Sequence, residues 1–357
     1  MTEPWLDIHP DFTLNGKHYT LAKLINLAEA LQFEGDKEDK ELAVFLLDWL
    51  YPKKTMLLKT SGTTGSPKSI ELDKQSMMAS AKATGIYFDL PAGTTALHCL
   101  SFNYIAGKMM FVRALVLGWH IEVVLPNRIP LSQTKNNFDF AAMVPLQVRE
   151  SLSELHRIKQ VIVGGAPVSE VLRQQLQEVP SRLYATYGMT ETITHVAIKK
   201  LNNCSPEELE QQAYHALDNV NFSTDDRSCL VIDAPAVAPE PVVTNDMVEL
   251  LSNTSFKWLG RADFVINSGG VKIHPEQVEQ VLDLVIDAPF FISSLPDEAL
   301  GQKVALVIEG DEDIFPEIDY VGLEPYEVPK EIFFVNEMKY TTTGKINREA
   351  TLKGLME

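Results

Sequence analysis

The chain carries, at residues 58–68, the sequence Leu58-Lys59-Thr60-Ser61-Gly62-Thr63-Thr64-Gly65-Ser66-Pro67-Lys68. Glycines among small hydroxyl residues let a backbone approach a polyphosphate closely, so that its N–H groups and hydroxyls donate to the phosphate oxygens. The spacing is not that of a P-loop, in which glycine and lysine are adjacent. A loop rich in Ser, Thr and Gly is often only a flexible surface segment. Here it follows a short apolar strand predicted at 56–58 and ends in proline and lysine, which favours phosphate binding.

Strand and helix patterns alternate after this loop. Helical spacing of apolar residues predicts helices at 38–50, 72–87 (with Asp73 as N-cap), 107–117 and after Ser169. Apolar runs predict strands at 56–58, 121–125, 138–144, 161–163 and 182–186. Strands separated by helices of this length pair in parallel through right-handed crossovers. The first two-thirds of the chain is therefore predicted to be a large α/β domain with parallel sheets.

The pattern changes near residue 260. Apolar runs at 264–266 and 271–273 flank Asn267-Ser268-Gly269-Gly270, which predicts a hairpin with a glycine-rich turn. A helix at 276–285, opened by Pro275, and strands at 304–308 and 331–335 follow. We therefore predict a large domain at 1–260 and a small α+β domain at 264–357, with the boundary at 261–263.

Composition narrows the functional classes. With 357 residues and 45% hydrophobic content, the chain can bury two cores. A formal net charge of −18 argues against a nucleic-acid partner. The start of the chain lacks signal-peptide features, and Arg113 interrupts the longest apolar stretch, so we expect no membrane insertion. Scattered cysteines indicate a reducing, cytoplasmic location. The histidines do not cluster, and His195 is interpreted as a packed strand residue.

The loop at 58–68 resembles the phosphate loop of the acyl-adenylate-forming (AMP-dependent synthetase/ligase) superfamily, and further motifs follow in that family's order. They are Gly164-Gly165-Ala166-Pro167, Tyr187-Gly188-Met189-Thr190-Glu191-Thr192, Thr244-Asn245-Asp246-Met247-Val248-Glu249, Gly260-Arg261-Ala262-Asp263 and Thr341-Thr342-Thr343-Gly344-Lys345-Ile346-Asn347-Arg348. The resemblance covers roughly residue 55 to the C-terminus, and the segment before the loop is short for the family.

The resemblance implies a role for each matching residue. Thr60, Ser61, Gly62, Thr63, Thr64, Gly65 and Lys68 would contact the phosphates of ATP, as would Thr190; Tyr187 and Gly188 would contact adenine; Gly164, Gly165 and Ala166 would line the acyl and adenine pocket; Asp246 and Arg261 would contact the ribose. Glu191 would help to hold Mg²⁺, which suits a hard carboxylate ligand. Asp263 would be the hinge between the domains, and Lys345 the catalytic lysine.

The segment Leu100-Ser101-Phe102-Asn103-Tyr104-Ile105-Ala106-Gly107-Lys108-Met109-Met110 resembles the acyl pocket of the o-succinylbenzoate–CoA ligases of menaquinone biosynthesis. It implies that Tyr104, Gly107 and Lys108 line the acyl site together with Gly164. Tyr104 and Leu146 depart from that subgroup, which usually has histidine and threonine there. Lys108 and Arg113 are candidate cations for a second substrate carboxylate, and the alternative is that they lie on the solvent side of a helix.

The resulting prediction is a ligase that uses ATP, Mg²⁺ and coenzyme A to activate a small carboxylate, with o-succinylbenzoate as the acid. Three alternatives stay open: another aryl- or acyl-CoA ligase, a stand-alone adenylation enzyme that loads a carrier protein, and a regulatory protein that binds nucleotide without catalysis. A homodimer and a monomer are both compatible with the sequence.

Overall fold

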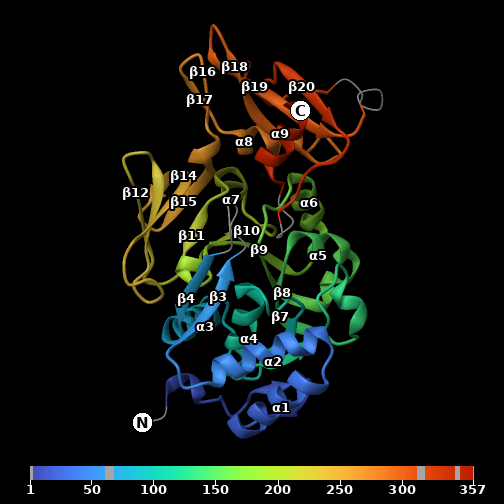
Figure 1. The fold of residues 1–357 in the computed structure, drawn as a ribbon, viewed down its shortest axis with the longest axis vertical. Helices are drawn as coiled ribbons and strands as arrows, with labels where there is room; N and C mark the ends of the chain where they lie inside the picture. Colours follow the sequence, from blue (N-terminus) through green and yellow to red (C-terminus); the bar gives the residue numbers. More distant parts are fainter. Residues whose placement is uncertain (1–2, 61–67, 312–317, 342–345, 357) are drawn as a thin grey trace.

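The computed structural model describes residues 3–60, 68–311, 318–341 and 346–356, and Figure 1 shows them arranged as a large body with a smaller one above it. The larger body contains a 13-stranded mixed sheet, and the smaller one contains a five-stranded sheet. The predicted boundary at 261–263 starts at Arg261, the last residue of the last strand of the first sheet, and ends before the first strand of the second. No helix in the described ranges is long and apolar enough to cross a membrane.

The 13-stranded sheet has a parallel centre, as predicted. Its order is β12-β13-β14-β15-β11-β10-β9-β8-β7-β5-β6-β1-β2. The strands are β1 (Thr13–Leu14), β2 (Lys17–His18), β5 (Thr95–His98), β6 (His120–Val123), β7 (Phe138–Met143), β8 (Ile158–Val163), β9 (Arg182–Gly188), β10 (His195–Lys200), β11 (Tyr214–Ala216), β12 (Asn221–Thr224), β13 (Cys229–Asp233), β14 (Val242–Ser252) and β15 (Ser255–Arg261). Pairing is parallel from β6 through β5, β7 and β8 to β9, and antiparallel from β9 to β12.

The described part of the large body has seven α-helices, of which the second, third, fourth and sixth lie close to where the sequence predicted helices, whereas the other three were not predicted. They are α1 (Leu21–Glu34), α2 (Lys37–Leu50), α3 (Lys74–Tyr87), α4 (Ile105–Leu117), α5 (Pro145–Glu150), α6 (Glu170–Gln175) and α7 (Pro206–Gln211). The Asp73 and Ser169 side chains accept hydrogen bonds from first-turn N–H groups, so both predicted N-caps are confirmed. Helix α4 ends at Gly118, which adopts the left-handed conformation with φ +74°.

The hairpin around the phosphate loop corrects two boundaries. Strand β3 (Thr55–Thr60) pairs antiparallel with β4 (Lys68–Asp73), and the two form a separate two-stranded sheet. The observed helix therefore starts at Lys74, two residues after the predicted start at Leu72, since Leu72 and Asp73 belong to β4. The predicted strand at 56–58 is buried on one face only, because Leu57 is 58% exposed between buried Met56 and Leu58.

A buried lysine ties α3 to α2. The Lys74 ammonium donates to the carbonyl oxygens of Asp48, Trp49 and Tyr51 at 2.6, 3.0 and 2.9 Å. These carbonyls belong to the C-terminal end of α2, where backbone acceptors lack partners within the helix. Burial lowers the pKa of Lys74 to about 8. Lys74, in the first turn of α3, thus donates hydrogen bonds to the backbone carbonyl groups that lack partners at the end of α2.

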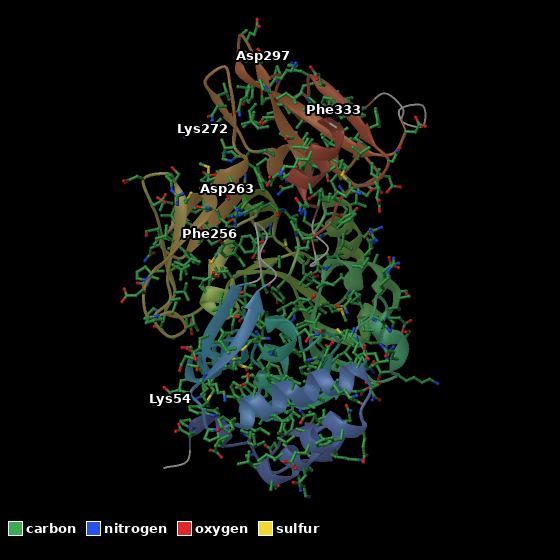
Figure 2. All side chains as sticks on the ribbon, in the orientation of Figure 1. Lys54, Phe256, Asp263, Lys272, Asp297 and Phe333 are labelled. Atoms are coloured by element: carbon green, nitrogen blue, oxygen red, sulfur yellow. The ribbon has the colours of Figure 1, made fainter. Side chains whose placement is uncertain are left out.

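The small body is built on β16 (Ile266–Ser268), β17 (Val271–Ile273), β18 (Phe290–Asp297), β19 (Gly301–Glu309) and β20 (Glu331–Val335), with α8 (Pro275–Leu282) and α9 (Arg348–Met356). The predicted hairpin is present, but its first strand begins at Ile266 because Phe264 closes the 3₁₀ turn η6 (Ala262–Phe264). Helix α8 ends at Leu282, three residues before the predicted end. Figure 2 shows Asp263 where the two bodies meet.

Candidate active site

Two predicted nucleotide residues, one on β9 and one on β14, are joined by a hydrogen bond between their side chains. The Tyr187 hydroxyl donates to Asp246 Oδ2 at 2.6 Å, and Asp246 is only 7% exposed. The Tyr187 ring packs edge-on against Phe256, with ring centroids 5.1 Å apart. Burial, together with the Asp246 carboxylate, raises the pKa of Tyr187 above its ordinary value. The phenol therefore stays protonated and holds the carboxylate in place.

Arg261 completes this cluster from the neighbouring strand. The β14–β15 register places Asp246 opposite Arg261, and the guanidinium Nη1 lies 3.7 Å from Asp246 Oδ1. Nη2 of the same guanidinium donates to Asp263 Oδ2 at 3.0 Å. Asn245 Nδ2 lies 3.4 Å from both carboxylate oxygens of Asp263. The structure thus brings the predicted ribose residues and the predicted hinge residue into one polar network.

The predicted adenine and magnesium motif forms a tight turn after β9. A Cβ on Gly188 would lie 2.1 Å from the carbonyl oxygen of Thr194, so only glycine fits there. The buried Thr192 hydroxyl closes the turn through the Met189 backbone. Thr190 is half-buried, and Glu191 is exposed, with no ion pair among the residues that the structure describes. Within those residues, no group of three or more metal-ligating side chains is found.

The glycines after β8 face the end of β9. A Cβ on Gly164 would lie 2.7 Å from the hydroxyl of Thr186, which precedes Tyr187. Gly165 has φ +87° and is exposed, as is Ala166. This loop therefore lies beside the predicted adenine motif, and a larger residue at Gly164 would push into it, whereas the pocket-lining role of the loop stays a prediction.

Helix α4 separates the two candidate cations of the acyl pocket. Gly107 is buried, and a Cβ on it would lie 2.2 Å from the Ser101 carbonyl oxygen, whereas Tyr104 is 49% exposed at the start of the helix. The Lys108 ammonium lies 5.9 Å from the centroid of the Phe45 ring in α2. Lys108 therefore faces α2, and burial lowers its pKa. The alternative that it lies in solvent is wrong, since it is 8% exposed.

Arg113 faces the opposite way and is 2% exposed, so the solvent-side alternative is wrong here too. Its Nε donates to Thr84 Oγ1 at 3.1 Å, and its Nη2 lies 3.4 Å from Thr194 Oγ1, just beyond the adenine motif. No carboxylate in the described ranges lies within ion-pair distance of it. Burial lowers the pKa of Arg113 to about 10, which leaves it charged at neutral pH. The sequence held no motif that identified Thr84 or Thr194 as its partners.

His195 lies beside this arginine. Its Nε2 is 3.3 Å from the Thr84 hydroxyl, and the imidazole is buried at the start of β10, as interpreted from the sequence. Burial, and then the Arg113 charge, hold the pKa of His195 well below its usual range. The histidine is therefore neutral, and Arg113 is the one charged member of this polar group of Thr84, Thr194, Ser80 and His195.

Several predicted residues lie outside what the structure describes. They are Ser61, Gly62, Thr63, Thr64 and Gly65 of the phosphate loop, the side chains of Thr60 and Lys68, and the catalytic candidate Lys345. The ends of β3 and β4 place the loop's two attachment points opposite each other, since Thr60 pairs with Lys68. The roles of these residues stay predictions.

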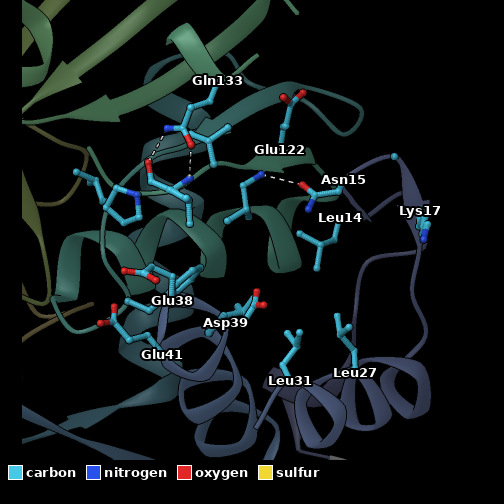
Figure 3. Close-up of a pocket in the computed structure, with 18 of the residues that line it drawn as sticks. Leu14, Asn15, Lys17, Leu27, Leu31, Glu38, Asp39, Glu41, Glu122 and Gln133 are labelled. Carbon is cyan, nitrogen blue, oxygen red and sulfur yellow. Dashed lines mark hydrogen bonds between the residues drawn. The ribbon is translucent and has the colours of Figure 1, made fainter. Parts of the chain in front are cut away.

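A cavity of about 750 Å³ lies elsewhere, between α1, α2 and the ends of β1 and β6. Figure 3 shows the carboxylates of Glu38, Asp39, Glu41 and Glu122 around it. None of the predicted site residues lines this cavity. Its acidic rim disfavours ATP and coenzyme A, which are both anionic. The candidate nucleotide site therefore remains at Tyr187, Asp246 and Arg261.

Comparisons with known proteins identify the family of the chain. The AMP-binding enzyme family matches residues 28–223. A 2-succinylbenzoate–CoA ligase of Staphylococcus aureus (strain Newman) is 24% identical over 381 residues, covering 96% of this chain and 77% of that protein. The solved structure of an acyl-CoA synthetase (AMP-forming)/AMP-acid ligase II-like protein from Dyadobacter fermentans is 38% identical, covers 92% of this chain and 98% of that one, and superposes with a TM-score of 0.61.

A further solved structure bears on the fold. The o-succinylbenzoate CoA synthetase of Bacillus subtilis, in complex with its acyl-adenylate intermediate, is 19% identical, covers 82% of this chain and 68% of that one, and has a TM-score of 0.72. The family match spans more than half of the chain and contains both the phosphate loop and the Tyr187 motif. With the adenylate-forming fold and these motifs in place, the chain belongs to the AMP-binding enzyme family.

Proposed function

We propose that the chain is an AMP-forming acid–CoA ligase that works through an acyl-adenylate. The observation that carries the proposal is the contact between Tyr187 and the buried Asp246, with Arg261 across the strand pair. A buried carboxyl group beside an aromatic residue suits a ribose, because its oxygens accept hydrogen bonds from both ribose hydroxyls while the ring packs near the base. The motif order supplies the remaining ATP contacts.

In the first half-reaction, a substrate carboxylate oxygen attacks the α-phosphorus of ATP, and pyrophosphate leaves. Charge builds up around phosphorus, so catalysis depends on positioning and on positive charge. We assign Lys345 and Lys68 to this charge stabilisation. Glu191 is exposed and makes no ion pair in the described part of the chain, so its carboxylate is available to Mg²⁺, which would neutralise phosphate oxygens.

In the second half-reaction, the thiol of coenzyme A attacks the acyl carbonyl carbon of the adenylate, and AMP leaves. The assignment of coenzyme A rests on the names of the relatives, which are CoA ligases or acyl-CoA synthetases. A carrier-protein thiol is the alternative acceptor.

We propose o-succinylbenzoate as the acid. The relatives from Staphylococcus, Listeria and Enterococcus are named 2-succinylbenzoate–CoA ligases. This substrate has two carboxylates, and only one of them is activated. Arg113 offers a buried positive charge without a protein carboxylate in the described ranges, next to the turn after the adenine motif. A cation in that state suits the second carboxylate, since burial strengthens the attraction between the two charges.

ATP–pyrophosphate exchange with a panel of aryl and alkyl acids tests the proposal. Exchange with o-succinylbenzoate, followed by a CoA thioester when coenzyme A is added, supports it in full. Exchange with another acid keeps the ligase and discards the substrate. Adenylate formation without thioester formation on coenzyme A favours a carrier-protein acceptor. Absence of exchange across the panel contradicts the ligase assignment, and nucleotide binding alone would then favour a regulatory protein.

A further inference from the structure

Helix α8 of the small body makes hydrogen bonds to the end of β15 in the large body. Gln277 Nε2 donates to the carbonyl oxygens of Trp258 and Leu259 at 3.3 and 2.9 Å. Glu276 Oε1 accepts a hydrogen bond from the backbone N–H of Arg261 at 3.2 Å. Figure 1 shows α8 above the ends of β14 and β15. These bonds cross the predicted hinge, since β15 belongs to the 13-stranded sheet and α8 follows the first strands of the other.

The other end of the same helix makes a second contact with the large body. Asp283, the C-cap of α8, accepts a hydrogen bond through Oδ2 from the backbone N–H of Val171 in α6 at 3.2 Å. Helix α8 is therefore attached to the large body at both ends. Hydrogen bonds at two separated points restrict rotation as well as translation of a rigid helix, so the relative placement of the two bodies depends on α8.

Glu276 makes its contact at an energetic cost. It is 8% exposed, and its Oε2 has no hydrogen-bond partner in the described part of the chain. A Cβ on Gly260, which has φ +155°, would lie 2.4 Å from that oxygen, so only glycine lets the carboxyl come so close. A buried, half-satisfied carboxyl group normally destabilises a protein. Burial raises the pKa of Glu276, and the charges of Arg348 and Arg261 oppose that shift, although neither guanidinium lies within ion-pair distance of the carboxyl group.

The bond from Glu276 ends on a residue of the candidate nucleotide site. The same Arg261 carries the guanidinium that lies 3.7 Å from Asp246 and 3.0 Å from Asp263. The backbone N–H of Arg261 is thus bonded to the small body, while the side chain of Arg261 contacts Asp246 in the large body. We propose that Glu276 is a positioning residue that couples docking of α8, through the Arg261 backbone, to the ribose contacts of Arg261 and Asp246.

This inference rests on the proposed function, because that function assigns Arg261 and Asp246 to the ribose. Coupling between two events is reciprocal. When α8 is docked, the Arg261 backbone is fixed and nucleotide affinity is high. When nucleotide is bound, docking is favoured by the same factor. Glu276 touches neither substrate nor the reacting atoms, so its effect reaches the nucleotide only through Arg261.

Three variants of the full chain test the coupling. Glu276→Ala removes the acceptor, whereas Glu276→Gln keeps an oxygen that can accept from the Arg261 N–H. Gln280→Ala, on the exposed side of α8, is the matched control. In the ligand-free protein, amide hydrogen exchange is followed in the peptides that contain Arg261. The affinity for AMP is measured separately by calorimetry.

We expect Glu276→Ala to speed exchange of the Arg261 amide and to weaken AMP binding, each by about 3- to 10-fold, the effect of losing one hydrogen bond. Glu276→Gln and Gln280→Ala should match the wild type in both measurements. If Glu276→Ala does not fold, Glu276→Asp replaces it, since the shorter carboxylate keeps its charge but cannot reach.

Two results overturn the proposal while leaving the proposed function intact. One is a wild-type chain that binds AMP and a Glu276→Ala variant that binds it equally well. The other is a Glu276→Gln variant that loses as much AMP affinity as Glu276→Ala, because the acceptor oxygen would then be irrelevant. A wild-type chain that binds no AMP refutes the proposed function itself and the coupling with it.

Discussion

Replacing Arg113 by methionine should change stability and activity in opposite directions. The guanidinium is 2% exposed and contacts two hydroxyls, those of Thr84 and Thr194. No carboxylate in the described ranges pairs with it. Burial alone lowers its pKa to about 10, so the ligand-free protein carries the cost of desolvating this charge. Methionine has a similar length and no charge to desolvate.

The magnitudes follow from these contacts. Replacing a buried ion pair or triad by apolar side chains of similar volume stabilises a protein by about 1–4 kcal/mol in known cases, and we take the same range for the buried Arg113 charge. The loss of two hydrogen bonds to hydroxyls offsets about 1–2 kcal/mol of that. The offset is small because both hydroxyls have other partners: Thr84 donates to the Ser80 carbonyl at 3.0 Å, and Thr194 lies 2.8 Å from the Ser80 hydroxyl. The two ranges together give a change in unfolding free energy of about −1 to +3 kcal/mol, centred on a gain of about 1 kcal/mol.

Activity should fall for the acid with two carboxylates. A hydrogen bond between charged groups is worth about 1.5–3 kcal/mol, so kcat/KM for o-succinylbenzoate should drop by roughly 10- to 150-fold. A monocarboxylic acid such as benzoate has no second carboxylate to lose, and its kcat/KM should change little. The ratio of the two kcat/KM values separates loss of this contact from general damage to the site.

Urea unfolding and coupled pyrophosphate-release assays measure both effects. Arg128→Met is the matched control, because Arg128 has a side chain that is 66% exposed and pairs with Glu150 at the surface. It should change stability by less than about 1 kcal/mol and leave both acids unaffected. An Arg113→Met variant that is markedly less stable than wild type, or equally active on both acids, would show that the arginine is structural and that the reasoning is wrong.

Three further outcomes are expected. Lys345→Ala should lower the pyrophosphate exchange rate by about 10²- to 10³-fold, as expected when one electrostatic donor is lost, with AMP affinity by calorimetry unchanged. Tyr187→Phe removes the 2.6 Å bond to the buried Asp246 and should cost about 1–3 kcal/mol of unfolding free energy; an unchanged urea midpoint would mean that water replaces the phenol. Lys74→Met removes three donors to the end of α2 and should cost about 3–5 kcal/mol, whereas Lys82→Met, at an exposed position of the same helix, should cost less than about 0.5 kcal/mol.

The parallel centre of the large sheet could be predicted because its strands are local apolar runs. Residues 138–144, 161–163 and 182–186 are each followed by a turn and a helical or capping signal, and the crossover rule then gives their pairing. Strand β4 was missed although its burial alternates, with Ser69 and Glu71 exposed and Leu72 buried. The last residues of β4 also carry the sequence signal of a helix start, since Asp73 is both the end of the strand and the N-cap of α3.

The candidate nucleotide residues could be named from the sequence because they lie in contiguous motifs, and their roles stay predictions. The polar group around Arg113 could not, since its members come from α3, α4 and the segment before β10, and no spacing rule connects them. One signal was present in the sequence. Met109, Met110, Phe111, Val112, Ala114 and Leu115 surround Arg113 with apolar residues on every side of the helix. A helix that is apolar all round is buried, so a cation within it is buried too.

Arg113 and Arg261 lie in different electrostatic surroundings, and we therefore assign them different roles. The Arg261 charge is opposed by Asp246 at 3.7 Å and Asp263 at 3.0 Å, so it adds little net attraction for an anion, and under the proposed function it would contact the ribose instead. Arg113 faces hydroxyls and a neutral histidine, so its charge is available to a substrate. In a chain with a net charge of −18, that local charge must overcome a repulsive background. Because it is buried, salt screens it weakly, and the preference for an acid with two carboxylates should persist at high ionic strength.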